Sequence, residues 1–402
     1  MSEHPSLLLT VTGRDRPGIA GRIFEELSRL DVDLLDVEQV QVHGRLLLSV
    51  EVVGPPGRVE DLGQAVRDAL GRWADEGPDG LVVSAVPIDP ARQPDPLTRV
   101  DSHLVTVLGP RLDAVAMGGV CGTVATCGSN VDRVVRLSTY PVTSYELTVS
   151  GGDAGRLRRE LGATAARLHV DVAVQPAGLH RRAKHLIVLD ADSTLLQGEV
   201  IDLLAAKAGC ADGVARVTAA AMAGEIDFTE SLARRLAMLV GTDAGLLDEV
   251  ARELTLTPGA RTLVRTLKRL GYVTAVVSGG FVQVVGPVAA ELGIDHLAAN
   301  TLEVADGRLT GRLIGPVVDR AGKAAALTRF AAASRVPLAQ TIAVGDGAND
   351  LDMLAAAGLG IAFNAKPVVR DAADAALSVP YLDAILFLLG IPRREIEAAD
   401  GV

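Results

Sequence analysis

The sequence has few cysteines and no excess of positive charge, and each shortage excludes a class of protein. Its three cysteines, Cys121, Cys127 and Cys210, are too scattered for a disulfide framework and form no CxxC zinc or redox pair. The formal net charge of -11 argues against a general affinity for nucleic acid or for an anionic membrane surface. We therefore expect an acidic protein whose thiols stay reduced, with no nucleic-acid partner.

Long apolar runs without interruption are also missing. The uncharged windows 114–131 and 271–290 are about as long as a bilayer span, but both contain glycines and polar residues. The second also contains Gln283 and Pro287 and divides into a strand, a glycine loop and a helix. The opening residues, MSEHPSLLLTVTGRDRPG, lack a basic region followed by a long apolar core. These features predict a cytoplasmic protein with no membrane partner.

The 402 residues suffice for two or three domains, and the first part of the chain contains a repeated pattern. Residues 7–53 predict the order strand, helix, strand, strand, followed by a helical segment at 59–77 and a strand at 81–88. A degenerate copy of this order runs over residues 103–170. The predicted units are 1–90 and 97–180, joined by the proline-rich linker PARQPDP at 90–96.

The turn after the first strand contains Gly13, Asp15, Pro17 and Gly18. Glycine lets backbone amides approach a small ligand, and proline fixes the entry to the helix. Taken alone, these residues are equally typical of an ordinary strand-to-helix turn. With the repeated order, the unit resembles the ACT domain, an amino-acid-sensing module, which implies a regulatory site at Gly13, Asp15 and Gly18. Only Gly109 of this turn is kept in the second unit, which is therefore only ACT-like.

From residue 181 to 402 short apolar strands alternate with helical segments. The strands are LIVL, YVTAVVS, TIAVGDG and LGIAF. This alternation predicts an α/β domain with a Rossmann-like doubly wound parallel sheet. Ligands bind beyond the carboxyl ends of the strands in such sheets, so the informative residues should follow each apolar run.

Acidic, hydroxyl and glycine residues follow three of these strands, and one lysine precedes the third. Singly, each has an ordinary explanation as a helix cap, a turn or a solvated charge. In this order and at these strand ends they resemble the four-part motif of the haloacid dehalogenase superfamily of phosphotransferases, over residues 184–390. The residues are Asp190, Asp192, Ser193 and Thr194, then Ser278, Gly279 and Gly280, then Lys323, then Gly345, Asp346, Gly347, Asn349 and Asp350.

Phosphate chemistry explains these residue types. A phosphomonoester is anionic, so its site must offset the charge of the oxygens and hold the attacking and leaving groups in line. A carboxylate can attack phosphorus, which divides hydrolysis into formation and breakdown of an aspartyl phosphate. The resemblance implies that Asp190 is this nucleophile and that Asp192 is the general acid and then the general base.

The resemblance also implies a metal ion and phosphate-binding groups. It implies that the ligands of Mg²⁺ are the Asp190 carboxylate, the Asp192 backbone carbonyl and Asp346, and that Asp350 orients these ligands from behind. The expected phosphate-binding groups are Ser278 and the Gly279 amide at a helix start, together with Lys323.

Roughly 70 residues separate the first acidic loop from the second strand, far more than one crossover helix requires. They are mostly helical in pattern, so residues 199–258 predict a cap that covers the site. Phe228 and Arg235 would share one helix face, and Glu199 begins the cap. A carboxylate and a guanidinium suit a zwitterion, with Glu199 on an ammonium and Arg235 on a carboxylate. A surface charge pair on a helical lid is the alternative.

Four stretches narrow the resemblance to the phosphoserine phosphatase family. They are DADSTLLQGEVID, GEIDFTESLARRLAMLVG, VSGGF and VGDGANDLDML. With two ACT-like units, the chain resembles the longer actinobacterial form. The resemblance implies that Glu199, Phe228 and Arg235 read the serine moiety and that Asn349 contacts the substrate. VLDAD stands where FDVD or FDFD is more common, which leaves both carboxylates in place.

The activity implied by the resemblance is magnesium-dependent hydrolysis of O-phospho-L-serine, the last step of serine synthesis. The ACT-like units imply feedback by an amino acid, most simply serine, and a homodimer or larger homo-oligomer. Two alternatives remain open. One is a phosphatase of the same superfamily that acts on another phosphorylated amino acid or small phosphomonoester. The other is a non-enzymatic sensor, which the presence of Asp190, Asp192, Lys323 and Asp346 disfavours.

Overall fold

The computed structural model describes residues 6–54, 64–65, 68, 80–88, 102–178, 181, 183–222 and 225–401. The chain divides into two compact units, Met1–Arg99 and Val100–Val402. The expected linker at 90–96 and most of the expected helix at 59–77 lie outside the described residues.

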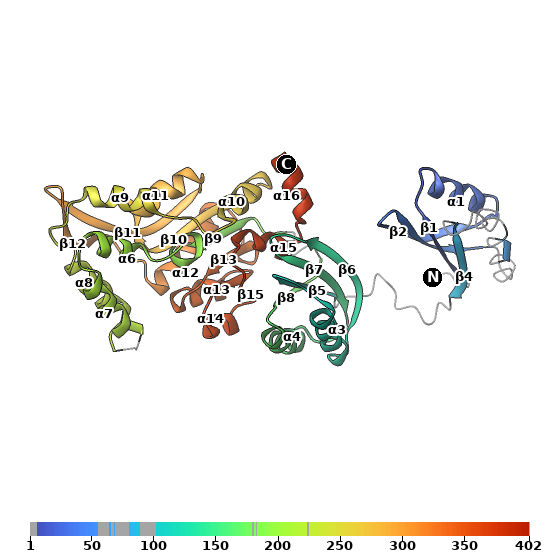
Figure 1. Cartoon of the computed structure of the whole chain (residues 1–402), viewed down its shortest axis with the longest axis horizontal. Helices are drawn as coiled ribbons and strands as arrows, with labels where there is room; N and C mark the ends of the chain where they lie inside the picture. The colour runs from blue at the N-terminus through green and yellow to red at the C-terminus, as the bar shows by residue number, and fades with distance from the viewer. Residues whose placement is uncertain are drawn as a thin grey trace. The chain divides into compact units, whose positions relative to one another are not determined.

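The first unit contains an antiparallel sheet of order β2-β3-β1-β4. Alternate side chains of β1 and β3 point toward helix α1, where Ile23 and Leu27 are buried with them. The expected order of strand, helix, strand, strand is confirmed (Figure 1). The elements are β1 (Ser6–Arg14), α1 (Ile19–Ser28), β2 (Asp33–Val42), β3 (Arg45–Val53) and β4 (Val82–Ile88).

The second unit begins with a sheet of order β6-β7-β5-β8, which repeats the arrangement of the first. Its helices α3 and α4 are capped by Asp113 and Asp153, whose carboxylates accept from the Ala116 and Arg156 amides. The elements are β5 (Ser102–Gly109), α3 (Ala114–Thr126), β6 (Asn130–Ser138), β7 (Thr143–Ser150), α4 (Ala154–Leu168) and β8 (Asp171–Pro176).

The rest of the second unit is built on a sheet of order β12-β11-β10-β9-β13-β14-β15. The neighbours β10, β9, β13, β14 and β15 are parallel, which confirms the doubly wound sheet. The strands are β9 (Leu186–Asp190), β10 (Val273–Phe281), β11 (His296–Ala305), β12 (Arg308–Ile314), β13 (Thr341–Gly345), β14 (Gly360–Phe363) and β15 (Ala375–Leu377).

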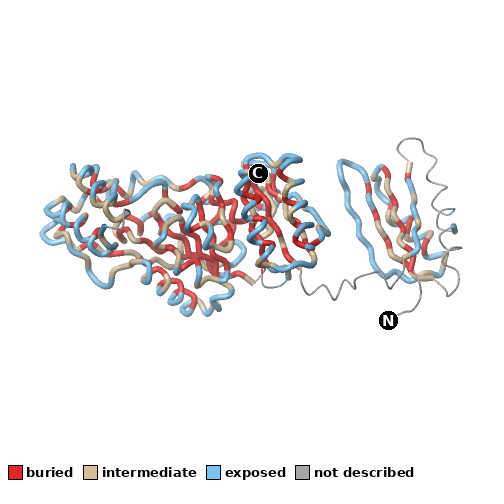
Figure 2. The backbone as a smooth tube through the Cα atoms, turned by 90° about the horizontal axis from the view of Figure 1, so that it is seen from below, coloured by how far each residue is buried: buried red, intermediate tan, exposed pale blue. Residues whose placement is uncertain are grey.

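Helices cover both faces of this sheet because its central strands are apolar on both sides. Ile187 and Leu189 of β9 pack in the core that holds α10 and α11, whereas Leu186 and Val188 pack in the core that holds α12, α13 and α14. Figure 2 shows buried segments in the interior of the second unit, with exposed segments around them. The helices are α10 (Ala260–Arg269), α11 (Val282–Glu291), α12 (Arg320–Ala333), α13 (Leu351–Ala356), α14 (Pro367–Ala372), α15 (Ile385–Leu388) and α16 (Arg393–Asp400).

A helical insertion follows β9, as the pattern predicted. Its two connections run beside each other, because Gln197 N donates to Thr255 O at 2.8 Å and Thr257 N donates to Leu195 O at 2.9 Å. The insertion therefore leaves and re-enters the sheet domain at one point. Its helices are α6 (Val200–Lys207), α7 (Ala211–Met222), α8 (Phe228–Ala237) and α9 (Gly245–Glu253).

Two features were not expected from the sequence. The edge of the large sheet is an antiparallel hairpin, β11 and β12, rather than another parallel strand. In addition, Leu108, Leu137 and Val142 of the ACT-like part are buried in the same core as α10 and α15. The ACT-like part of this unit is therefore packed onto the sheet domain. No helix among the described residues is both long and apolar enough to cross a membrane.

Candidate active site

Asp190 ends the central strand β9, and its side chain is buried. Its Oδ1 accepts a hydrogen bond of 2.6 Å from Lys323 Nζ, and the same ammonium donates to Asp350 Oδ1 at 2.7 Å. Burial raises the pKa of Asp190 well above its usual value, although the charge of Lys323 opposes this rise. Burial alone would lower the pKa of Lys323, but the two carboxylates outweigh it and raise that pKa. Lys323 is thus held as a cation between two acids.

The chain after Asp190 makes a wide turn, η3 (Ala191–Leu195), in which Ser193 has a left-handed φ of 56°. This turn brings Asp192 back toward the sheet. Its Oδ1 accepts from the Val200 amide at 2.8 Å, and its Oδ2 accepts from Ser278 Oγ at 3.1 Å. Burial raises the pKa of Asp192 above the ordinary value of an aspartate. Two donors therefore fix a carboxyl group that is easier to protonate than usual.

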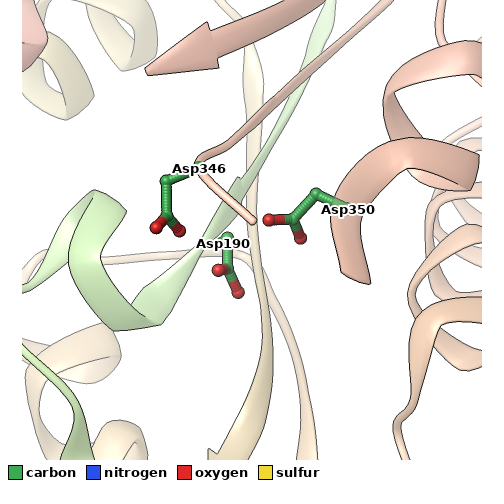
Figure 3. A group of neighbouring side chains, drawn as sticks. All are labelled: Asp190, Asp346 and Asp350. Atoms are coloured by element: carbon green, nitrogen blue, oxygen red, sulfur yellow. The ribbon is translucent and has the colours of Figure 1, made fainter. Parts of the chain in front are cut away.

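Two further carboxylates follow β13. Asp346, Asp350 and Asp190 place carboxylate oxygens within 4.8 Å of one another (Figure 3). The two oxygens of Asp350 are occupied, because they accept from Lys323 and from the Gly347 amide at 3.0 Å. Burial raises the pKa of Asp346 to about 6, and the nearby Asp350 adds to that rise. One buried lysine thus faces three acids.

The last residue of β13 is Gly345, and a larger residue would not fit because Asp350 occupies the space that its side chain would need. A Cβ on Gly345 would lie 2.4 Å from Asp350 Cγ, closer than atoms can approach. The glycine of this motif therefore allows Asp350 to fold back under the strand end.

The expectation of a helix start at Ser278 and Gly279 is wrong. Strand β10 continues to Phe281, and α11 begins at Val282. The strand is prolonged because Asn300 Nδ2 donates to Gly279 O at 2.8 Å and Phe281 pairs with Asn300 in the sheet. The Gly279 amide is therefore presented by an extended strand end.

A cavity of about 610 Å³ lies at this sheet edge under the inserted helices. It brings together residues that lie far apart in the sequence. Among those expected from the sequence, its lining contains Asp190, Asp192, Glu199, Arg235, Gly279, Lys323, Asp346 and Asn349.

Three residues that the sequence predicted for this site are not among these lining residues. Ser278 is fully buried, and its hydroxyl donates to Asp192 and accepts from the Gly280 amide, so it lies behind the cavity wall. Asp350 is also buried behind the wall. Phe228 begins α8, the helix that holds Arg235, but its side chain lies outside the described part of the structure.

Glu199 and Arg235 give the cap side of the cavity both signs of charge. Desolvation raises the pKa of Glu199 to about 7, and the nearby Asp192 and Asp346 add to the rise. Desolvation lowers the pKa of Arg235, and the charges of Glu199, Asp202 and Asp192 oppose that change. Glu199 Oε1 accepts from Ser193 Oγ at 3.2 Å. The two groups therefore face one space without an ion pair between them in the structure.

The turn expected to be regulatory lies in the first unit. Gly18 has a φ of 93° at the start of α1, and the Asp15 amide donates to Gly44 O at 2.8 Å. A Cβ on Gly13 would lie 2.8 Å from Gly80 O, so this position admits only glycine. These contacts explain the turn as a structural feature, and its ligand remains a prediction.

Sequence reasoning missed two residues of the site. Asn300 holds the strand end of Gly279, but it lies on the hairpin that was not expected. Lys366 lines the cavity just before α14, and its ammonium forms no hydrogen bond or ion pair with a described residue. Its position after a fourth apolar strand, β14, could have identified it.

Comparisons with known proteins agree with this architecture. The family model of haloacid dehalogenase-like hydrolases matches residues 187–355, and ACT domain models match residues 6–76 and 101–175. The chain is 54% identical over 399 residues to a phosphoserine phosphatase of Streptomyces coelicolor, covering 99% of this chain and 95% of that one. It is 53% identical over 402 residues to the phosphoserine phosphatase SerB2 of Mycobacterium tuberculosis, covering 98% and 96%. The structure of a probable phosphoserine phosphatase from Vibrio cholerae aligns with a TM-score of 0.58 at 31% identity, covering 76% and 90%.

Proposed function

The chain belongs to the phosphoserine phosphatase family of haloacid dehalogenase-like hydrolases, and on that premise we propose that it hydrolyses O-phospho-L-serine to L-serine and phosphate. One observation carries this proposal. A single cavity holds the acid pair Asp190 and Asp192 on the sheet side and the charge pair Glu199 and Arg235 on the cap side. The first pair suits phosphoryl transfer, and the second suits the two charges of an amino acid.

Asp190 is the proposed nucleophile. Lys323 holds its Oδ1, and no hydrogen bond from a described residue occupies its Oδ2. That oxygen attacks phosphorus as the bond from phosphorus to the serine oxygen breaks, which gives an aspartyl phosphate. Water then attacks the phosphorus and releases phosphate, which restores the Asp190 carboxylate.

Asp192 is the proposed proton carrier for both halves of the reaction. Its raised pKa suits a group that enters the reaction protonated, and it donates that proton to the leaving serine oxygen. As a carboxylate it then takes a proton from the attacking water. The bonds from Val200 and Ser278 keep its oxygens in position through both steps.

The residues present fit a magnesium ion. Asp190, Asp346 and Asp350 bring three acids to one place, and Lys323 balances only part of their charge. The proposed ligands are the Asp190 carboxylate, the Asp192 backbone carbonyl and Asp346, all hard oxygen donors. Asp350 would support them from behind, because Lys323 and Gly347 already occupy its oxygens. When bound, the ion would offset negative charge on the phosphoryl oxygens.

The phosphoryl group is proposed to lie between the Gly279 amide and Lys323. Both residues line the cavity beside Asp190. Amide and ammonium donors at this place would stabilise the charge that develops on the phosphoryl oxygens. Ser278 is proposed to act on the phosphate through Asp192, since its hydroxyl already donates to that carboxylate.

The cap is proposed to bind the serine moiety of the substrate. Glu199 would accept from the ammonium, and Arg235 would bind the carboxylate through two nitrogen donors. Asn349 lines the same cavity and offers an amide to the substrate. Phe228 lies two turns before Arg235 on α8 and is proposed to contact the substrate from that helix.

We further propose that the enzyme completes serine biosynthesis in the cytoplasm and that the ACT domains give feedback by an amino acid, most simply serine. The turn at Gly13, Asp15 and Gly18 is the proposed ligand site of the first ACT domain. Pairing of ACT domains between two copies of the chain would give a homodimer. The matches of both ACT models support the domains themselves.

Phosphate release from a panel of phosphomonoesters tests the activity. The panel contains phosphoserine, phosphothreonine, phosphoethanolamine and glycerol phosphate, each with and without Mg²⁺ and serine. We expect phosphoserine to be preferred, Mg²⁺ to be required and serine to slow turnover. Equal turnover across the panel would favour the alternative, a phosphatase for other small phosphomonoesters.

The variant Asp190→Asn tests the mechanism, with Asp248→Asn on the exposed surface of α9 as the control. We expect Asp190→Asn to lose at least about 10⁴-fold in kcat and the control to keep its rate. Acid-quenched protein should contain bound phosphate in the wild type and none in Asp190→Asn. Turnover retained by Asp190→Asn would refute the assignment of the nucleophile.

A further inference from the structure

A second cavity, of about 630 Å³, lies between the ACT-like part of the second unit and the sheet domain. One wall is the exposed face of α4, and the opposite wall is formed by α14 and the start of β15. Beside two arginines, the α4 face bears small side chains here, at Gly162, Ala163 and Ala166. Small residues usually let neighbouring elements approach closely, but in this place a space remains.

The two walls are fixed to each other. Asp171, at the start of β8, accepts from the Ser378 amide at 2.6 Å and from its hydroxyl at 2.7 Å. Gln175 Nε2, further along β8, donates to Leu388 O at 2.8 Å. The cavity is therefore enclosed by two parts of the chain that are joined on one side.

The cavity contains guanidinium groups that the protein itself does not use. Arg159 of α4 and Arg370 of α14 line it, and neither guanidinium forms a hydrogen bond or ion pair with a described residue. Arg158 beside them makes only a 3.4 Å contact with Val174 O. Two or three cations thus line the cavity, and none of them forms an ion pair with a described residue.

The acids of this cavity form no ion pair with these guanidinium groups. Burial raises the pKa of Asp171 and the charge of the nearby Arg370 opposes that rise, but both oxygens of Asp171 accept hydrogen bonds from Ser378. Asp374 Oδ2 accepts from the Gly360 amide at 2.9 Å. Asp371 is exposed and forms no ion pair with Arg370 in the structure. The open positions on the guanidinium groups are therefore suited to an external oxyanion, which they can bind through two nitrogen donors each.

Helix α14 connects this cavity with the candidate active site. Lys366, Val368 and Val369 line the active-site cavity, whereas Pro367 and Arg370 line the second one. The helix has only six residues, and the Arg370 amide donates to Lys366 O at 3.1 Å. A displacement of Arg370 would therefore act on the position of Lys366 in the active site.

We propose that this second cavity binds a small oxyanion, either the carboxylate of an amino acid or inorganic phosphate, between Arg159 and Arg370, and that binding alters turnover through α14. The site differs from the turn at Gly13, Asp15 and Gly18 in the first unit. Binding can be measured without turnover, so its failure is distinguishable from a failure of the proposed function.

Calorimetric titration of the full chain with inorganic phosphate and, separately, with L-serine tests the proposal. The double variant Arg159→Ala, Arg370→Gln removes the cations, and Gly162→Leu fills the cavity without changing charge. A Cβ on Gly162 meets no atom within 4 Å, so the leucine can be accommodated at the helix surface. Arg394→Ala on the exposed face of α16 is the control for a lost positive charge.

We expect one of the two ligands to bind the wild type and the Arg394→Ala variant at a site beyond the active site. At that site both cavity variants should bind at least about 10-fold more weakly. The same ligand should lower kcat in the wild type and not in the cavity variants, while competition with substrate stays unchanged. Melting temperatures equal to that of the wild type exclude misfolding as the cause.

Serine and phosphate are titrated separately, so the ligand whose affinity falls in the cavity variants identifies the source of the oxyanion. Equal affinity of both ligands for the wild type and the two cavity variants would overturn the proposal. Inhibition that is purely competitive in every variant would overturn it as well.

Discussion

Lys323 Nζ lies 2.6 Å from Asp190 Oδ1, and both side chains are buried at the carboxyl edge of the sheet. The lysine comes from α12 and the aspartate from β9, which are far apart in the sequence. A buried ion pair of this kind is costly to break, because each partner would remain as an uncompensated charge. The contact therefore both positions the proposed nucleophile and supports the fold.

We expect Lys323→Met to abolish phosphate release and to destabilise the protein by about 3–5 kcal/mol. The reason is that Asp190 and Asp350 would then be buried without a cation. Urea unfolding and phosphate release measure the two effects. Lys268→Met is the control, because Lys268 pairs with Asp295 at the surface and its loss should cost about 0–1 kcal/mol. Equal losses of stability in the two variants would contradict this account.

Glu199 gives a prediction about pH. Its pKa is raised to about 7 by burial, with Asp192 and Asp346 adding to the rise, so it loses its charge as the pH falls through that value. A neutral Glu199 cannot pair with the substrate ammonium, so KM for phosphoserine should rise by up to about 10-fold per pH unit below 7.

Steady-state kinetics from about pH 5.5 to about pH 8.5 test this prediction, because Glu199 titrates within roughly this range. Glu199→Gln should have a high KM that no longer depends on pH in this way. A phosphomonoester without an ammonium controls for the titration of the phosphate itself and should show no such rise in the wild type. The same pH dependence in Glu199→Gln would show that another group is responsible.

Asp192→Asn should lower kcat for phosphoserine by about 10²–10⁴-fold, because the leaving serine oxygen then receives no proton. An aryl phosphate has a leaving group that needs little protonation, so formation of the phosphoenzyme from it should be much less affected. Rapid-quench kinetics with both substrates separate these steps. A loss of equal size in phosphoenzyme formation from both would indicate a role for Asp192 other than proton transfer.

Lys366 lines the active-site cavity and forms no ion pair with a described residue. Phosphoserine carries a net negative charge, so Lys366→Ala should raise KM several-fold with little change in kcat, and the increase should shrink at high salt. Arg394→Ala removes one positive charge from the surface of α16 and should leave KM unchanged. A fall in kcat with KM unchanged would exclude a role in attracting substrate.

Most helices and strands could be predicted from the sequence. The reason is that each kind of element imposes a fixed spacing on its apolar residues, and turn residues separate one element from the next. The β11–β12 hairpin was missed, since Leu302 and Leu309 are buried there among polar residues that do not form a long apolar run. The helix expected at Ser278 was wrong because a contact from the distant Asn300 prolongs the strand. Pairing across the sheet decided both features.

The same division holds for the site. The sequence by itself pointed to Asp190, Asp192 and Asp346, because each follows a strand and the order of strands brings these ends to one edge. It pointed to Lys323 through its place in the family motif, on the helix before the third of these strands. Only the tertiary structure decided that Ser278 lies behind Asp192, that Lys366 lines the active-site cavity and that arginines of α4 and α14 line a second cavity. The physical reason is that strand ends are local features, whereas burial, ion pairing and the space between two packed domains depend on side chains far apart in the chain.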